Sequence, residues 1–196
     1  MTRPWLTPPA GEAAGQVARL AAALPEIITE RLVLRAPRLA DWPLLEPIWT
    51  TARGVHIGGP MSPEDAWLDF NQMVASWLLR GHGAFTIIRR ADGAVLGVAT
   101  LDHEWGDPEP EIGWLLTEAA EGHGYAREAG RALRDRAAAL LGPDGFVAYV
   151  ARGHTRSVRV AEALGGTPDA APHPLDADVL AYRFGPTPSP QTETAR

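Results

Sequence analysis

The stretch that decides the fold of this chain is EGHGYAREA at residues 121–129, which opens a helical pattern running from about Tyr125 to Leu141. Two glycines one residue apart, Gly122 and Gly124, let the backbone come close to a ligand and point several N–H groups in one direction. The helix that follows places about half a positive charge at its N-terminus. The segment therefore predicts an anion site at the start of a long helix.

Three interpretations compete for glycines in front of a helix, and two of them fail on the residues that follow. A dinucleotide fingerprint needs a third glycine where Arg127 stands, and a nucleotide P-loop needs Lys-Ser or Lys-Thr after its last glycine. A glycine-rich helix start that binds nothing stays open on this segment alone. Arg127 and Arg131 lie one helical turn apart and could reach further phosphate groups.

Strand and helix patterns on both sides of this stretch predict a mixed sheet in one α/β or α+β domain. Strands are expected at 30–35, 84–90, 94–103, 111–116, 146–150 and 178–184, and helices at 42–49, 63–80, 125–141 and 157–164. Pro47 must bend or end the first helix, while Ser62 caps the second and Gly81 stops it.

The predicted domain occupies most of the chain. Residues 1–25 are interpreted as an N-terminal extension with a short helix, and residues 26–185 as the domain itself. Residues 186–196, rich in Pro and Thr, are expected to form a disordered tail. No repeat and no linker divides the chain.

The composition of the 196-residue chain narrows the class of protein. A net charge of -6 disfavours nucleic acid as a partner and suits a cationic substrate. The lack of cysteine excludes disulfides, a thiol nucleophile and thiolate metal sites, and is compatible with the cytosol. No stretch approaches the roughly 20 apolar residues of a membrane span. We therefore expect a cytoplasmic protein that binds neither nucleic acid nor a membrane.

Several segments resemble, in the same order, those of the GNAT acyltransferase superfamily, and most closely its RimJ/RimL-like N-acetyltransferase branch. The stretch from Gly122 to Ala129 resembles the phosphate loop of that family. The other matching segments are Glu30–Arg35, the strand that contains Gly97, Glu111–Trp114, Thr155–Gly165 and Asp178–Tyr182. The likeness covers about residues 26–184. It implies a mixed, mostly antiparallel sheet with helices on both faces and a splayed fourth strand.

The resemblance also implies acetyl-CoA as the co-substrate and no metal. Carried over position by position, the cofactor-binding residues are Trp114, Leu115, Leu116, Gly122, His123, Gly124, Tyr125, Ala126, Arg127 and His154. Two residues depart from the family pattern. Glu121 stands where Gln, Arg or Trp is usual, and His154 stands where Asn is usual. An acid beside a pyrophosphate should repel it unless the side chain points away.

Acyl transfer to an amine needs a base for the ammonium, donors for the oxyanion and a proton for the leaving thiolate. Alternation places Glu111, Gly113 and Leu115 on one face of their strand. Glu111 is the candidate base and Glu104 the reserve, while a solvated strand-end carboxylate is the alternative for Glu111. Ser157 is the candidate donor to the thiolate, although a serine at that point is more readily an N-cap.

Acidic residues surround the candidate base: Asp102, Glu104, Asp107, Glu109 and Glu111. Such a cluster would favour a positively charged amine over an anionic acceptor, or would only keep an exposed edge soluble. The resemblance therefore implies an N-acetyltransferase for a peptide N-terminus or a small amine. A non-catalytic acyl-CoA-binding module and an antibiotic-modifying acetyltransferase are the alternatives.

The acceptor should depend on two loop regions, Thr51–Met61 and the residues around Asp169–Asp178. Loop chemistry does not by itself name a ligand. The sequence is compatible with a homodimer, but no residue demands one.

Overall fold

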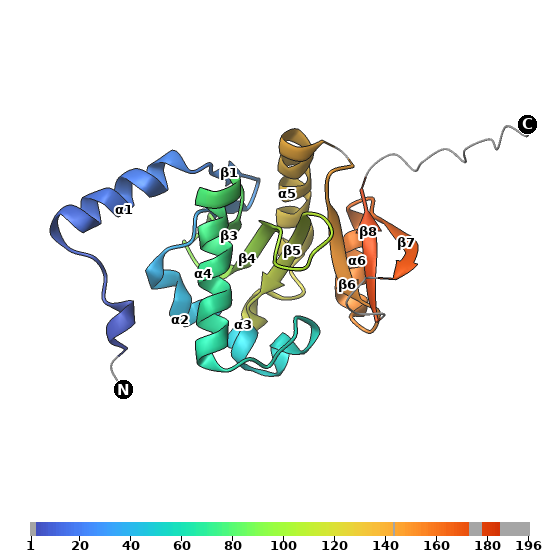
Figure 1. The fold of residues 1–196 in the computed structure, drawn as a ribbon, viewed down its shortest axis with the longest axis horizontal. Coiled ribbons are helices and arrows are strands. Elements are labelled where there is room, and N and C mark those ends of the chain that lie inside the picture. Colours follow the sequence, from blue (N-terminus) through green and yellow to red (C-terminus); the bar gives the residue numbers. More distant parts are fainter. Residues whose placement is uncertain (1–2, 143, 173–177, 185–196) are drawn as a thin grey trace, which may run out of the picture.

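A computed structural model describes residues 3–142, 144–172 and 178–184, and an eight-stranded sheet lies at its centre (Figure 1). The strand order is β1-β2-β3-β4-β5-β6-β8-β7. The strands are β1 Ile27–Ile28, β2 Leu32–Arg35, β3 Ala84–Arg89, β4 Val95–Asp102, β5 Glu111–Leu116, β6 Val147–Ala151, β7 Thr167–Pro172 and β8 Val179–Arg183. The predicted tail at 186–196 lies outside the described residues.

The sheet is mixed and mostly antiparallel, as expected, because only β5 and β6 run parallel. These two strands are in register at one pair, Glu111 with Val147, and then separate. The strand predicted as the fourth is β5 in the structure. The numbering shifts by one because the two-residue strand β1 precedes the first predicted strand. The splayed strand implied by the family resemblance is therefore present.

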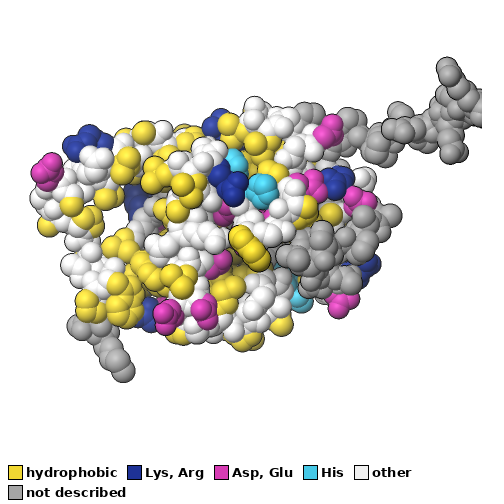
Figure 2. Space-filling model, in the orientation of Figure 1, with side chains coloured by type: hydrophobic (Ala, Val, Ile, Leu, Met, Phe, Trp, Pro, Cys, Tyr) yellow, Lys and Arg dark blue, Asp and Glu magenta, His cyan; other side chains and the backbone are white. Residues whose placement is uncertain are grey.

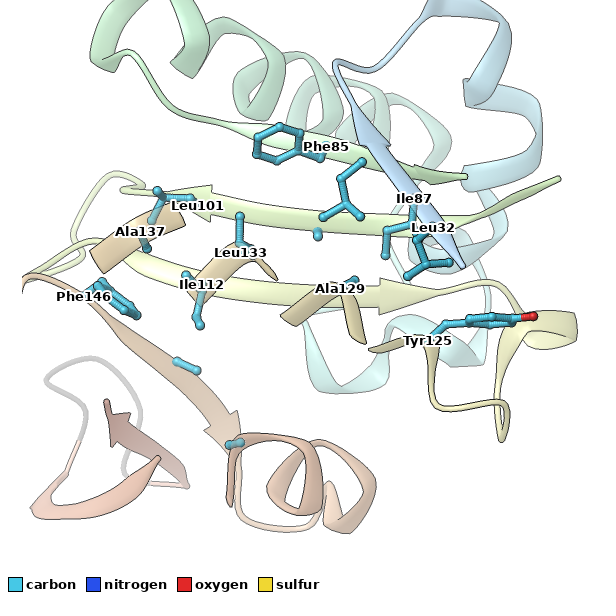
Figure 3. Close-up of a cluster of buried hydrophobic side chains, with 14 of the residues drawn as sticks. Leu32, Phe85, Ile87, Leu101, Ile112, Tyr125, Ala129, Leu133, Ala137 and Phe146 are labelled. Atoms are coloured by element: carbon cyan, nitrogen blue, oxygen red, sulfur yellow. The ribbon is translucent and has the colours of Figure 1, made fainter. Parts of the chain in front are cut away.

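Helices cover both faces of the sheet, which confirms the prediction. The helices are α1 Gly11–Ala23, α2 Trp42–Leu45, α3 Pro47–Thr50, α4 Pro63–Arg80, α5 Tyr125–Leu141 and α6 Thr155–Ala163, with 3-10 turns η1 Pro4–Leu6, η2 Leu39–Asp41, η3 Ala52–His56 and η4 Glu118–Ala120. α5 and α6 lie on one face and α2, α3 and α4 on the other. Figure 3 shows the α5 side, where Ala129 and Leu133 of the helix meet Leu101 and Ile112 of the sheet.

The opposite face carries a second apolar cluster rich in tryptophan. Trp42 and Trp49 pack with Phe70 of α4 against the sheet residue Val98. Trp77 is 6% exposed and donates its indole N–H to the Ala84 carbonyl at 2.8 Å. Trp77 is therefore part of the core.

The ends of the helices before the hairpin follow the local signals in the sequence. The Ser62 hydroxyl accepts the Asp65 N–H at 3.1 Å, which caps α4 as predicted. Gly81 ends that helix at a φ of 76°, a conformation that glycine adopts without strain. Pro47 separates α2 from α3.

Two strands and one helix boundary differ from the predictions. The strands β1 and β7 were not predicted, because one is only two residues long and the other carries prolines, which cannot donate to a ladder. α6 begins at Thr155, and the Val158 N–H bonds the His154 carbonyl to close its first turn. Ser157 therefore lies inside the helix, and the prediction that it caps the helix is wrong.

The N-terminal helix α1 contributes no buried side chain and lies beside the sheet in Figure 1. Within the described ranges, no helix is both long and apolar enough to cross a bilayer.

A buried carboxylate, Asp41, ties β2 and β3 to the turn η2. It accepts two hydrogen bonds from the Arg35 guanidinium, one from the Thr86 hydroxyl and one from the Arg38 N–H, each at 2.8 Å. Burial opposes its charge, but the hydrogen bonds from Arg35, Arg38 and Thr86 outweigh burial and hold the pKa of Asp41 below its usual value. The folded chain therefore depends on this ion pair.

We expect Asp41→Asn to lower the free energy of unfolding by about 3–5 kcal/mol, because it leaves the Arg35 charge buried without its partner. Urea unfolding followed by circular dichroism measures this loss. Asp92→Asn, which breaks the exposed pair with Arg89 in the hairpin turn, is the matched control and should change stability little. Equal losses in the two variants would contradict the role given to Asp41.

Candidate active site

Two adjoining hollows open where β5 and β6 separate. The groove, of about 280 Å³, is lined by Trp114, Leu116, Glu121, Gly122, Gly124, Tyr125, Ala126, Arg127, His154, Arg156, Ser157, Arg159 and Val160. The acidic pocket, also of about 280 Å³, includes Trp49, His56, Asp69, Thr100, Glu104, Glu111, Leu115 and Tyr149 in its lining. Trp114, His154 and Ser157 line both hollows, so the two lie side by side and together form the cleft.

The glycine loop has the backbone shape that the sequence predicted. Gly122 and Gly124 have φ angles of 77° and 78°, in the left-handed region that side chains strain. Gly124 is the N-cap of α5, so the first N–H groups of a 17-residue helix point out of its end beside the groove. This is the geometry of a helix-terminal anion site.

The loop is held in place from the β1–β2 turn. Glu128, in the first turn of α5, accepts the Thr29 hydroxyl and the Arg31 guanidinium, each at 2.6 Å. Arg31 also donates to the His123 carbonyl at 3.0 Å and lies over the Tyr125 ring. His123 is not among the described residues that line the groove, although it belongs to the loop beside it.

Glu121 lines the groove, but its charge is shared by two arginines. It forms ion pairs with Arg53 of η3 and Arg156 of α6. Burial opposes the charge, and the hydrogen bonds from both arginines outweigh burial and keep the pKa of Glu121 below its usual value. The expectation that this acid repels an anion unless it points away is therefore corrected, since the three side chains together carry one net positive charge.

The two histidines at the junction stack on one another. The His154 ring lies 4.2 Å from the His56 ring, with an angle of 14° between their planes. Burial, together with His56 and Arg156, lowers the pKa of His154, so the ring is neutral at neutral pH. His154 occupies the N-cap position of α6 without a side-chain cap. The His154 side chain therefore lines the cleft as an uncharged ring.

The end of β5 provides the wall between the hollows. Trp114 and Leu116 pack toward the α5 core and Leu115 toward the opposite cluster, which is the predicted alternation. The Leu116 carbonyl accepts the Arg53 guanidinium at 2.9 Å. Gly97 of β4 allows this strand to lie close, because a Cβ there would stand 2.0 Å from the Leu115 carbonyl oxygen.

The acidic pocket gathers only part of the acidic cluster that the sequence suggested. Glu104 and Glu111 line it, and Asp69 of α4 joins them. Glu109 does not belong there, because both its oxygens accept the Arg183 guanidinium at 2.8 Å. Asp107 instead accepts the Glu104 backbone N–H at 2.8 Å. Glu111 is therefore a pocket carboxyl and not a solvated strand-end group.

The pocket carboxyls resist ionisation. Loss of solvent raises the pKa of Glu111 to about 8, and Asp107, Glu104 and Asp102 add their repulsion. Burial also raises the pKa of Glu104 to about 7, again with help from neighbouring acids. A group with a pKa near the working pH can both hold and release a proton, as a general base must.

Other cleft residues were missed or differently placed by the sequence analysis. Arg156 and Arg159 line the groove, and their spacing of three on a helix was a usable signal. Arg53 carried no such signal, since it reaches the cleft from a distant turn. Of the predicted phosphate-binding pair Arg127 and Arg131, only Arg127 lines the groove. Arg131 lines a separate hollow beside Thr29, which Arg127 also lines. On the face seen in Figure 2, acidic and basic side chains are interspersed among apolar ones.

An open mixed sheet whose parted strands lead to a helix-terminal anion loop can hold a phosphate-bearing carrier. Residues 31–167 match the acetyltransferase (GNAT) domain family. The chain belongs to the GNAT acetyltransferase family, as the sequence resemblance implied, and is an acetyl-CoA-dependent acetyltransferase.

Solved structures agree with this assignment. The chain is similar to an acetyltransferase from Agrobacterium tumefaciens str. C58, with 39% identity, a TM-score of 0.78 and coverage of 84% of this chain and 96% of that one. A GNAT-family acetyltransferase from Bacillus anthracis shares the fold at 23% identity and a TM-score of 0.63, covering 81% and 96% of the two chains. RimL, a ribosomal L7/L12 alpha-N-protein acetyltransferase, shares it at 19% identity and a TM-score of 0.61, covering 82% and 98%.

The raised pKa of Glu111 predicts that the fold weakens as pH rises. The folded chain keeps a proton that the unfolded chain loses, so stability falls between about pH 4.5 and about pH 8. Glu111→Gln removes this dependence and should raise Tm above that of the wild type at about pH 8, but not at about pH 4. Thermal melts over this range measure the effect. The control is Glu64→Gln, at the exposed start of α4, whose Tm should change with pH as the wild type does. If the Tm of Glu111→Gln also changed with pH as the wild type does, the burial of the Glu111 carboxyl would be contradicted.

Proposed function

We propose that this enzyme transfers the acetyl group of acetyl-CoA to a primary amine, on a small molecule or a peptide N-terminus, by direct attack in a complex that holds both substrates. The observation that carries the proposal is the cleft, whose two adjoining hollows contain the anion loop in the groove and Glu111 in the acidic pocket. An amine arrives at neutral pH as an ammonium ion, so the pocket carboxyls attract it and provide a base for its proton.

The groove suits acetyl-CoA by its donors and its shape. Backbone N–H groups at the start of α5 match a pyrophosphate, and Arg127, Arg156 and Arg159 line the same groove and would hold phosphate oxygens. Trp114 and Leu116 give the opposite wall an apolar surface. The structure of RimL, which shares this fold, is a complex with coenzyme A. When bound, acetyl-CoA supplies the activated acetyl thioester.

The residues of the chain would move the protons. Glu111 accepts the proton of the bound ammonium, and Glu104 is the reserve base in the same pocket. Ser157 lines both hollows and would donate to the leaving thiolate. An acyl-enzyme on a cysteine is excluded because the chain has none, so the amine attacks the thioester directly. We place this reaction in the cytoplasm, with which a chain free of cysteine is compatible.

A non-catalytic acyl-CoA-binding module drew its support from Glu121 and His154. The ion pairs of Glu121 with Arg53 and Arg156 remove much of that support, since the groove carries no unpaired acid at this point. The pocket around Glu111 favours catalysis. An antibiotic-modifying enzyme would differ only in its acceptor, and an aminoglycoside in the amine panel tests it.

The glycine loop should fail when Gly124 carries a side chain. Gly124→Val strains a residue with a φ of 78° and covers the N–H groups of α5, so acetyl-CoA binding should weaken by about 100-fold or more, about 2.8 kcal/mol. Isothermal titration with acetyl-CoA measures this. Gly93→Val is the matched control, because Gly93 has a φ of 74° in a hairpin turn outside the groove. Wild-type affinity in Gly124→Val would remove the anion-loop assignment.

Glu111→Gln should lower turnover by about 10²- to 10⁴-fold while acetyl-CoA still binds, because the base is lost. In the wild type, kcat/KM should rise with pH toward a plateau above about pH 8. Glu104→Gln removes a neighbouring negative charge, so it should move that rise to lower pH. Coenzyme A release, followed with a thiol reagent across pH, measures both effects. Turnover of Glu111→Gln close to that of the wild type would show that this residue is not the base.

A further inference from the structure

The charge balance of the acidic pocket differs from that of the rest of the molecule. Several carboxylates elsewhere are paired with arginine: Asp41 with Arg35, Glu46 with Arg3, Glu109 with Arg183, Glu121 with Arg53 and Arg156, and Glu128 with Arg31. The pocket is lined by Asp69, Glu104 and Glu111, and no arginine is among the described residues of its lining. The chain has no lysine that could take that place. No described arginine therefore neutralises these carboxyls once they ionise, and a cationic ligand can do so.

A buried carboxyl beneath the pocket points to the same conclusion. Asp102 pairs with Glu111 across β4 and β5, which places both side chains on the pocket face of the sheet. It is 2% exposed, and one of its oxygens accepts the Ser76 hydroxyl at 2.7 Å. The other oxygen is buried with no hydrogen-bond partner among the described residues. Burying such an oxygen costs free energy that a bound cation can offset.

The carboxyls reach the pocket from three separate elements. Asp69 belongs to α4, Glu111 to β5, and Glu104 to the loop that follows β4. Among the described residues, no group of three or more His, Asp or Glu side chains could hold a metal ion. An extended organic cation can contact carboxyls of more than one of these elements.

The walls beside the carboxyls are apolar. Trp49, Ile57, Met61 and Met73 line the pocket together with the carboxyls. Methylene groups can lie against them, and the Trp49 ring can face an ammonium.

We propose that the acidic pocket selects a small acceptor with two positive charges: the primary amine that receives the acetyl group and a second ammonium several carbons away, as in a diamine or polyamine. This inference rests on the proposed function. Glu111 takes the proton of the reacting ammonium, so that end becomes neutral. The second ammonium stays charged and pairs with Asp69 and Glu104. A monoamine leaves these two carboxyls unpaired, and the backbone of a peptide N-terminus brings no second ammonium to them.

The kinetic test compares linear diamines with monoamines of equal length. With the full chain and acetyl-CoA, release of coenzyme A is measured for butane-1,4-diamine and pentane-1,5-diamine against butylamine and pentylamine. We expect kcat/KM to be at least about tenfold higher for the diamines, since a desolvated charge pair is gained. In Asp69→Asn the diamine-to-monoamine ratio should fall toward one, mainly through KM. Glu64→Gln, exposed on the same helix, should keep the wild-type ratio.

A binding measurement supplies a readout independent of turnover. Butane-1,4-diamine is titrated calorimetrically at about pH 7.5 in two buffers that differ in ionisation enthalpy. A bound cation favours the ionised form of the pocket carboxyls, so binding should release protons to the buffer. Binding without proton release would overturn the inference. Turnover of monoamines, or of a peptide N-terminus, as efficient as that of diamines would also overturn it, while leaving the proposed function intact. Absence of coenzyme A release with every amine, although acetyl-CoA binds, would overturn the proposed function itself.

Discussion

The separation of β5 from β6 after one registered pair, Glu111 with Val147, is the constraint on which the cleft depends. Two parallel strands paired along their whole length would close the sheet and leave no hollow between the glycine loop and α6. β5 stays in the sheet from its other side, because Gly97 lets β4 lie against it where any Cβ would meet the Leu115 carbonyl. The open edge therefore arises beside a strand that is firmly held.

Charge then divides the cleft into two parts of opposite character. In the groove, one carboxylate from Glu121 lies between Arg53 and Arg156, so the surface near the glycine loop is net positive. In the acidic pocket, Asp69, Glu104 and Glu111 share the lining, and none of its described residues is an arginine. The carboxyls of the pocket disfavour an anion, and the arginines of the groove disfavour a cation. The same cleft can therefore hold an anionic donor and a cationic acceptor in fixed positions.

Local signals in the sequence predicted much of the fold. The cap at Ser62, the stop at Gly81 and the break at Pro47 act within one or two turns of chain, so they hold in any tertiary setting. The β1 and β7 strands were not predicted, because they are strands only through their partners in the sheet. The start of α6 also differed, since the turn at His154 after β6 decides it and displaces Ser157 into the helix.

The sequence by itself determined the anion loop, because the conformations of Gly122 and Gly124 and the helix that follows are properties of adjacent residues. It also indicated Glu111 by strand alternation. Only the tertiary structure decided which charges meet. Asp69 comes from α4 and Arg53 from η3, while Glu109 is drawn away by Arg183 of β8. Their contacts depend on how distant elements pack, and electrostatic pairing over such sequence separations leaves no periodic pattern along the chain.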